Sequence, residues 1–169
     1  MIQVRIHGRG GQGVKKSAQL IARACFLKGY ITQDFALYGA ERRGAPVVSF
    51  VRLDEKKVNT RGYVFEPDYI IILDESVSQE TCLKGKSEKT KVVVNGIGFC
   101  NVNASDIAMK HIGKNVPNIA LLGAFAKVSG LFTLKELKEA VKIELGKKGG
   151  EIIKKNMMAA KECFEKVRC

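Results

Sequence analysis

The sequence predicts a single α/β domain over residues 1–169, with a mostly parallel sheet flanked by helices. Two observations carry this prediction. Short apolar runs typical of buried strands alternate with longer segments of helical periodicity, which is the pattern of layered α/β proteins. A glycine-rich segment also follows directly on the first strand-like run, as in strand–loop–helix units that bind ligands at the carboxyl end of a sheet.

The first strand is expected at residues 2–6, where IQVRI alternates and is rich in β-branched residues. A helix over roughly 12–28 follows, with Gly29 as its C-cap. Its apolar face comprises Val14, Ala18, Ile21 and Cys25. Residues 30–35 are a weaker second strand.

Residues 37–46 contain two glycines and a proline and are expected to form a loop, followed by a clear strand at 47–53. PDYIIILD at 67–74 is a continuous apolar run between acids, typical of a strand buried on both faces. A short helix around 75–84 then leads to another buried strand at 91–96.

The C-terminal part is expected to be helical. A short helix is predicted at 104–113 and a buried helix, apolar on nearly all sides, at 118–130. Thr133 and Glu136 fit a capping box that starts the next helix. After GKKGG at 146–150, a terminal helix presents one apolar face, made of Ile153, Met157, Ala160, Phe164 and Val167.

Composition is that of an ordinary globular protein, with 46% hydrophobic and 27% charged residues, but the net charge is +12. Nucleic acid, a phosphate-bearing ligand and acidic subunits could each explain such a charge. The basic residues are scattered and lack neighbouring aromatic motifs, which disfavours nucleic acid. No apolar run approaches the ~20 residues of a membrane span, and the N-terminus has no secretory h-region, so we expect a cytoplasmic protein.

The five cysteines lie 57, 18, 63 and 6 residues apart, and none forms a CxxC pair. This spacing disfavours an iron–sulfur cluster or zinc site held by this chain alone, so no metal ligand is predicted. The odd count favours free thiols over a disulfide framework. Cys25 is expected in the core.

IHGRGGQG at residues 6–13 matches the Rossmann-like fingerprint through Gly8, Gly10 and Gly13. Gly8 permits a tight turn, Gly10 allows a phosphate to approach the backbone, and Gly13 allows close packing of helix and strand. Gly11 and Gln12 complete the candidate cofactor-binding set. The spacing alone is also compatible with a tight turn that binds nothing.

A nicotinamide dehydrogenase also requires an acidic residue at the end of its second strand, about 20 residues on. The candidate, Asp34, lies within its run instead. No Tyr-x-x-x-Lys pair or His–Asp arrangement for hydride transfer is evident, so no catalytic residue is assigned. His7, directly before the loop, is expected either to pack or to contact a ligand.

YGAERRGAPVVSF at 38–50 places Glu41, Arg42 and Arg43 between two glycines. The two arginines could bind a phosphate or a carboxylate of another chain, with Glu41 orienting one of them, or the triplet could be a solvated loop. Asn118 is expected to be a helix N-cap at the edge that carries the glycine loop, where it could touch a ligand.

Together, GRGGQG at 8–13 and YGAERRGAPV at 38–47 resemble the gamma subunits of 2-oxoacid:ferredoxin oxidoreductases, in the form typical of the pyruvate or branched-chain 2-oxoacid enzymes. Pro67-Asp68, NIALLGA at 118–124 and Asn156 also fit that family, so the resemblance spans about residues 2–160. ERRGAPV joined to GxGGQG is its most specific part.

The resemblance implies that alpha, beta and delta-type subunits carry thiamine diphosphate, Mg²⁺ and iron–sulfur clusters. The assembly decarboxylates a 2-oxoacid such as pyruvate, passes the acyl group to coenzyme A and reduces ferredoxin. This chain alone is then expected to be inactive. Its glycine loop is expected to contact the phosphates of coenzyme A or a neighbouring subunit. Arg42 and Arg43 are likewise expected to contact either coenzyme A or a neighbouring subunit. The rival functions are an NAD(P)-binding dehydrogenase and a non-catalytic scaffold.

Overall fold

The computed structural model describes residues 1–37, 44–146 and 149–169. The strands of this part are β1 (Ile2–Arg9), β2 (Ile31–Ala36), β3 (Pro46–Asp54), β4 (Tyr69–Ile72), β5 (Lys91–Asn95) and β6 (Cys100–Val102). Its helices are α1 (Val14–Leu27), α2 (Gln79–Leu83), α3 (Ala104–Ile112), α4 (Asn118–Ser129), α5 (Leu134–Leu145) and α6 (Gly150–Lys166). The strands join one sheet in the order β2-β3-β1-β4-β5-β6.

The sheet is mostly parallel, as predicted. β1, β4, β5 and β6 pair in parallel, whereas β3 is antiparallel to both β1 and β2. The reversal of β3 follows from its connection to β2, which spans nine residues and is shorter than a parallel crossover requires.

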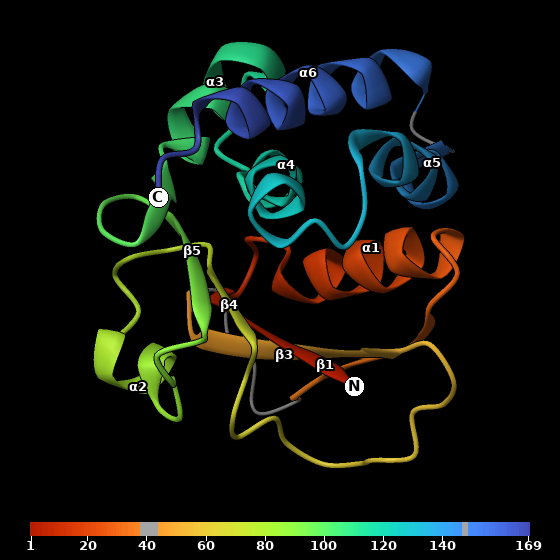
Figure 1. Cartoon of the computed structure of the whole chain (residues 1–169). Coiled ribbons are helices and arrows are strands. Elements are labelled where there is room, and N and C mark those ends of the chain that lie inside the picture. The colour runs from red at the N-terminus through yellow and green to blue at the C-terminus, as the bar shows by residue number, and fades with distance from the viewer. Residues whose placement is uncertain (38–43, 147–148) are drawn as a thin grey trace.

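Most helices lie on one face of the sheet (Figure 1). α1 packs against β1, β2 and β3, and α4 packs against β5. α6 covers α4 on the side away from the sheet and also contacts α3 and α5. Side chains that alternate along the strands supply the sheet's share of this core, including Val4, Ile6, Ile71 and Val93.

The other face of the sheet has a smaller apolar cluster beneath α2. The same alternation supplies it, because β4 and β5 are buried on both sides. Its buried members are Ile70, Ile72, Val77, Cys82, Val92 and Val94.

Two buried arginines connect this second face to the segments that cover it. Arg52, with no exposed surface, donates to the carbonyl oxygens of Gly62 (2.7 Å) and Tyr63 (3.1 Å). Arg5 donates to the carbonyl oxygens of Val64 (3.2 Å) and Cys82 (2.9 Å). Burial lowers the pKa of both guanidinium groups. The terminal nitrogens of both are hydrogen-bonded, whereas Nε of Arg5 is buried without a partner among the described residues.

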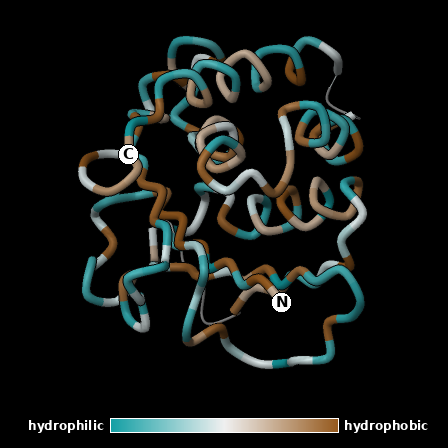
Figure 2. The backbone as a smooth tube through the Cα atoms, viewed as in Figure 1, coloured by the Kyte–Doolittle hydropathy of each residue, from teal (hydrophilic) through white to brown (hydrophobic). Residues whose placement is uncertain are grey.

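α4 is the most completely buried of the described helices, and its buried residues are nearly all small or apolar (Figure 2). A Cβ at Gly123 would lie 1.9 Å from the carbonyl oxygen of Ala160 in α6, so only glycine permits this close crossing. Gly123 is therefore a close-packing position between α4 and α6. In the described part of the chain, no helix combines the length and apolar character needed to cross a membrane.

The predicted elements are present, with three differences. β6 was not predicted, because its three residues carry too short a pattern. α2 covers only Gln79–Leu83 of the helix expected at 75–84, since the side chain of Asp74 accepts hydrogen bonds from Ser76 and forms a turn there. The C-cap of α1 is Lys28, and Gly29 follows it with φ +105°. The capping box of Thr133 and Glu136 is confirmed.

The expectation of free thiols is wrong for two of the five cysteines. Cys100 and Cys169 form a disulfide across a sequence separation of 69 residues. Backbone hydrogen bonds between Asn101 and Arg168 bring the end of the chain beside β6, which no spacing in the sequence reveals. Cys25, Cys82 and Cys163 are free and buried, and burial raises their pKa values to about 12, 11 and 12.

Candidate functional site

The glycine loop, residues 10–13, connects the carboxyl end of β1 to the start of α1. β1 pairs in parallel with β4, so the carboxyl ends of these two strands lie side by side. After β1 the chain builds β2 and β3 on one side, and β4 and β5 lie on the other. The loop therefore lies at a topological switch point, where α/β sheets commonly bind ligands.

Three glycines of the motif are required for different reasons. A Cβ at Gly8 would lie 2.8 Å from Cγ2 of Val14, so Gly8 permits the close approach of strand and helix. Gly11 has φ +96° and open space around it. Gly13, the N-cap of α1, has φ +80°, and a Cβ there would lie 2.6 Å from Nδ2 of Asn118. A turn is thus present between β1 and α1, but it is formed at Gly11 and Gly13, whereas Gly8, to which the turn was assigned, lies within β1 and provides the close packing of strand and helix.

The backbone of Gly10 is hydrogen-bonded to the segment before β3 and extends the sheet. Its N–H donates to the carbonyl oxygen of Ala45 (2.8 Å), and its carbonyl oxygen accepts from the N–H of Gly44 (3.2 Å). These bonds extend the pairing of β1 with β3 past its last strand residues. The backbone of Gly10 is therefore occupied within the chain.

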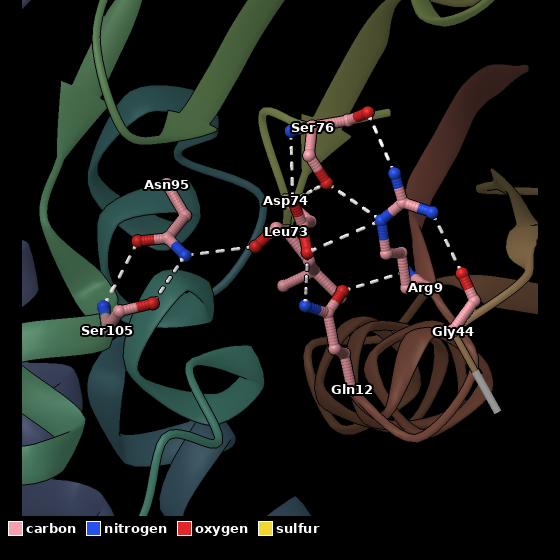
Figure 3. Close-up of polar contacts among 8 residues, drawn as sticks. All are labelled: Arg9, Gln12, Gly44, Leu73, Asp74, Ser76, Asn95 and Ser105. Atoms are coloured by element: carbon pink, nitrogen blue, oxygen red, sulfur yellow. Dashed lines mark hydrogen bonds and ion pairs between the residues drawn. The ribbon is translucent and has the colours of Figure 1, made fainter. Parts of the chain in front are cut away.

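Gln12 connects the loop to the end of β4 (Figure 3). Its Oε1 accepts from the N–H of Arg9 (2.7 Å), and its Nε2 donates to Oδ2 of Asp74 (2.6 Å). Both ends of the amide are thus hydrogen-bonded inside the protein. In this structure Gln12 fixes the position of the loop over the β1–β4 junction.

Arg9 strengthens this connection. Its guanidinium group donates to the hydroxyl and the carbonyl oxygen of Ser76 (2.7 and 2.9 Å) and to the carbonyl oxygen of Gly44 (2.8 Å). Burial acts to raise the pKa of Asp74, but hydrogen bonds from Ser76 and Gln12 and the charge of Arg9 outweigh it and lower that pKa. Asp74 is therefore held as a carboxylate.

A cavity of about 540 Å³, here called the loop cavity, opens beside the glycine loop. The first turn of α1, the end of β2 and the start of β3 form its walls. Arg9, Lys15 and Lys16 contribute three cationic side chains to the lining, against one carboxylate, Glu144, which pairs with Lys16. Positive side chains and a helix N-terminus together favour an anion.

A second cavity of about 460 Å³ lies on the other side of Gln12 and Asp74, over the ends of β4 and β5. Its lining is made largely of amides and carboxylates, namely Gln12, Asp74, Glu75, Asn95, Asn103 and Asn115. Asn95 is fully engaged there with Ser105 and the carbonyl oxygen of Leu73. The absence of cationic side chains from this lining makes the loop cavity the better anion site of the two.

Asn118 lies against the loop, but it is not the helix cap that the sequence predicted. The N-cap of α4 is Pro117, and Asn118 is the first residue of the helix. Its side chain is 4% exposed and meets Gly13, and its Oδ1 has no hydrogen-bond partner. Asn118 thus lies beneath the loop, on the side of Gly13.

The remaining candidates fall elsewhere. Glu41, Arg42 and Arg43 lie outside the described residues. Asp34 lies in the middle of β2 and faces Lys15, Arg23 and Glu144, and burial raises its pKa.

His7 is 5% exposed on β1, and its Nε2 is buried without a partner. Burial, and then the charge of Arg5, lower its pKa to about 4.

Sequence reasoning missed the cluster of Arg9, Asp74 and Ser76 and the lysines of the first turn of α1. Arg9 and Asp74 each directly follow a buried strand run, and that common position was the available signal. In the described ranges, no group of three or more His, Cys, Asp and Glu side chains is arranged to hold a metal ion.

Comparisons with known proteins agree with this fold. Residues 3–166 match the pyruvate ferredoxin/flavodoxin oxidoreductase family. The common gamma subunit of pyruvate/ketoisovalerate oxidoreductases from Thermococcus litoralis is 37% identical, over 98% of this chain and 97% of that protein. Pyruvate synthase subunit PorC from Methanocaldococcus jannaschii is 36% identical, over 99% and 97%.

A crystal structure leads to the same family. Pyruvate oxidoreductase subunit PORC from Thermotoga maritima superimposes with a TM-score of 0.85 and 31% identity, over 99% of this chain and 97% of that one. The resemblance drawn from the two loops is therefore confirmed. The chain belongs to the pyruvate ferredoxin/flavodoxin oxidoreductase family, in which it matches gamma subunits along their length.

Proposed function

We propose that the chain is the gamma subunit of a pyruvate:ferredoxin oxidoreductase located in the cytoplasm. It works with alpha, beta and delta-type subunits, and the assembly converts pyruvate and coenzyme A to acetyl-CoA and CO2 while it reduces ferredoxin. One relative is named as a subunit common to pyruvate and ketoisovalerate oxidoreductases. This supports placing the choice of 2-oxoacid in the partner subunits.

The partner subunits carry thiamine diphosphate with Mg²⁺ and the iron–sulfur clusters in this proposal. Thiamine diphosphate supplies the decarboxylation chemistry and the clusters supply electron transfer. The cysteines of this chain suit neither task, because two form a disulfide and the other three are buried in the fold. Its own residues contribute to binding and assembly.

The loop cavity is the proposed contact site for coenzyme A. The observation that carries this assignment is the cationic lining of Arg9, Lys15 and Lys16 beside the N-terminus of α1. Coenzyme A is a polyanion, and its phosphates suit such a lining. Gly11, with open space at its Cα, allows a ligand close to the backbone. Asn118 supports the loop from below.

A scaffold role for the loop is the second candidate, and a specific observation favours it. Gly10 and Gln12 are hydrogen-bonded within the chain, as is the guanidinium group of Arg9, so much of the motif already has a structural task. In this version the loop shapes a surface for a neighbouring subunit. Glu41, Arg42 and Arg43 serve either candidate, as contacts for coenzyme A or for that subunit.

The test is steady-state kinetics of the assembled oxidoreductase carrying Lys15→Gln with Lys16→Gln. We expect the KM for coenzyme A to rise about tenfold while the KM for pyruvate is unchanged, because two phosphate contacts of roughly 0.5–1 kcal/mol each are lost. Lys56→Gln with Lys57→Gln, in the turn after β3, is the matched control. An unchanged KM for coenzyme A would assign the loop to the scaffold role.

Arg42→Ala with Arg43→Ala distinguishes, in the same assay, between coenzyme A and the neighbouring subunit as the contact of these two arginines. A raised KM for coenzyme A with normal assembly assigns the arginines to the ligand. A reduced yield of the complex with a normal KM assigns them to the neighbouring subunit.

A further inference from the structure

A groove between α5 and α6 is separate from the loop cavity and has no part in the proposed function. It has a volume of about 470 Å³ and lies where the two helices pack together (Figure 1). Its apolar floor comes from α6, through Ile153, Met157 and Met158. Ile153 and Met157 are half-buried, and Met158 is 46% exposed.

The α6 side of the groove is a regular helical stripe. The lining residues Gly150, Ile153, Lys154, Met157, Met158 and Lys161 follow one another at steps of three and one. This spacing keeps them on one helix face over the twelve residues from Gly150 to Lys161, or roughly 16 Å at the rise of an α-helix. The groove is therefore long enough for about three turns of another helix.

The rim of the groove is uniformly basic. Lys138 and Lys142 of α5 and Lys154 and Lys161 of α6 line it, and none of the described residues in its lining is acidic. Lys142 pairs with Glu139 at 2.8 Å and Lys161 with Glu165 at 3.9 Å. Lys138 and Lys154 make no hydrogen bond or ion pair with any other described residue.

We propose that this groove binds an acidic amphipathic helix of a partner protein. The floor takes the apolar side chains of such a helix at positions i, i+3, i+4 and i+7, and the lysines take the carboxylates on either side. The two methionines adapt to the shape of the incoming side chains. Opposite charge across the rim fixes the orientation of the helix and speeds its association.

Two other occupants fit less well. A second copy of this chain would bring the same basic rim against itself, because a two-fold interface pairs each patch with its own copy. An anionic membrane surface would attract the lysines, but membrane binding requires apolar side chains that protrude. Here Ile153 and Met157 are half-buried between the helices, and of the three floor residues Met158 alone is exposed.

The first test measures binding of the full chain to a labelled 18-residue peptide that carries Leu at i, i+3, i+4 and i+7 and Glu beside them. Fluorescence anisotropy compares it with a scrambled peptide of the same composition. We expect Lys138→Glu with Lys154→Glu to weaken binding about tenfold, because two ion pairs become repulsions. Lys56→Glu with Lys57→Glu is the control of equal charge change and should have no effect.

Equal binding of the scrambled peptide, or equal loss in the control variant, would overturn the proposal. Stronger binding to phosphatidylglycerol vesicles than to the peptide, abolished in Lys138→Glu with Lys154→Glu, would also overturn it. A dimer seen in sedimentation and dissociated by the same two substitutions would overturn it as well. Met158→Glu provides a second variant whose fold is safe because that side chain is largely exposed. It should weaken binding of the peptide to a similar degree.

Cross-linking of the native chain in its purified complex identifies the natural partner helix. A carbodiimide that joins lysine amines to carboxylates should link Lys138 and Lys154 to acidic residues of one helical segment. Lys56 and Lys57 serve as reference sites. Links scattered over many segments, or none from the groove, would contradict the proposal. Because the peptide assay uses the chain alone, its result stands apart from whether the complex is a pyruvate oxidoreductase.

Discussion

Gly13 and Asn118 show how one position of the loop depends on a distant residue. Gly13 has a positive φ and its Cα faces the buried amide of Asn118, whereas Gly11, also at positive φ, has nothing within 4 Å. A substitution at Gly11 therefore meets only backbone strain. A substitution at Gly13 meets strain and a collision.

We expect Gly11→Ala to lower the free energy of unfolding by about 1 kcal/mol and Gly13→Ala by about 2–3 kcal/mol. Urea denaturation of the isolated chain measures both. The additional loss in Gly13→Ala should largely disappear when Asn118→Ala is added, because the colliding amide is then gone. Equal losses at Gly11 and Gly13, or no rescue by Asn118→Ala, would show that the contact does not determine the preference for glycine.

Single residues also mark the limit of what the sequence could tell. Spacing and glycine chemistry predicted a glycine turn between the first strand and the first helix, but placed it at Gly8, which lies within β1. The same reasoning could not predict that Gln12 and Arg9 bond to Asp74 and Ser76, because these pairs are more than 60 residues apart and form only when β1 lies beside β4. A hydrogen-bond donor in a motif can bind a ligand or hold the motif itself.

At the scale of elements, buried apolar runs and capping residues predicted which strands and helices exist. They predicted the direction of a strand and the length of an element less well. The run of β3 is a clear strand, but its reversal depends on the length of the connection from β2. β6 has only three residues and is recognised by its pairing with β5. Helix α2 is cut short by the turn at Asp74, a tertiary feature of the site.

α3 and α6 are connected by Glu162, and this contact should respond to pH. Its carboxylate lies 2.7 Å from Nζ of Lys166, 2.6 Å from Nε2 of His111 and 2.9 Å from Nζ of Lys110. The hydrogen bonds from Lys166, His111 and Lys110, in that order, lower the pKa of Glu162 from 4.5 to about 2. A lowered folded pKa stabilises the protein above the unfolded value, and that stability is lost as the pH falls toward 2.

We expect Glu162→Gln to reduce the free energy of unfolding by about 1–2 kcal/mol at pH 7, a range that allows for solvent screening of the lysines. The difference from the wild type should shrink steadily below pH 4.5, because the wild-type carboxylate becomes protonated. Urea denaturation between pH 7 and pH 3 measures it. Glu165→Gln, whose pair with Lys161 is exposed, should run parallel to the wild type. Parallel curves for Glu162→Gln would contradict the assignment.

In the molecule as a whole, the glycine loop and the helical layer are connected through packed elements. α1 starts at the glycine loop, packs on the sheet and contacts α5, and α5 forms the groove with α6. The proposed coenzyme A contact and the proposed partner groove are thus connected through two packed helices. The α/β layering could be predicted from the alternation of strand and helix patterns. The connection between the loop cavity and the groove could not, because it depends on packing between helices that are distant in sequence.

The end of the chain is fastened across these layers by the disulfide between Cys169, beyond α6, and Cys100 in β6. We expect Cys169→Ser to lower the free energy of unfolding by about 2–4 kcal/mol, because the bond closes a long loop and reduces the entropy of the unfolded chain. For a domain of this size that corresponds to a fall in Tm of about 5–10 °C. Calorimetry without reductant measures it. Dithiothreitol should lower the Tm of the wild type to that of Cys169→Ser and leave the variant unchanged. A wild-type Tm that does not respond to dithiothreitol, with Cys169→Ser equally stable, would show that the end of the chain is held by its backbone pairing to Asn101 alone.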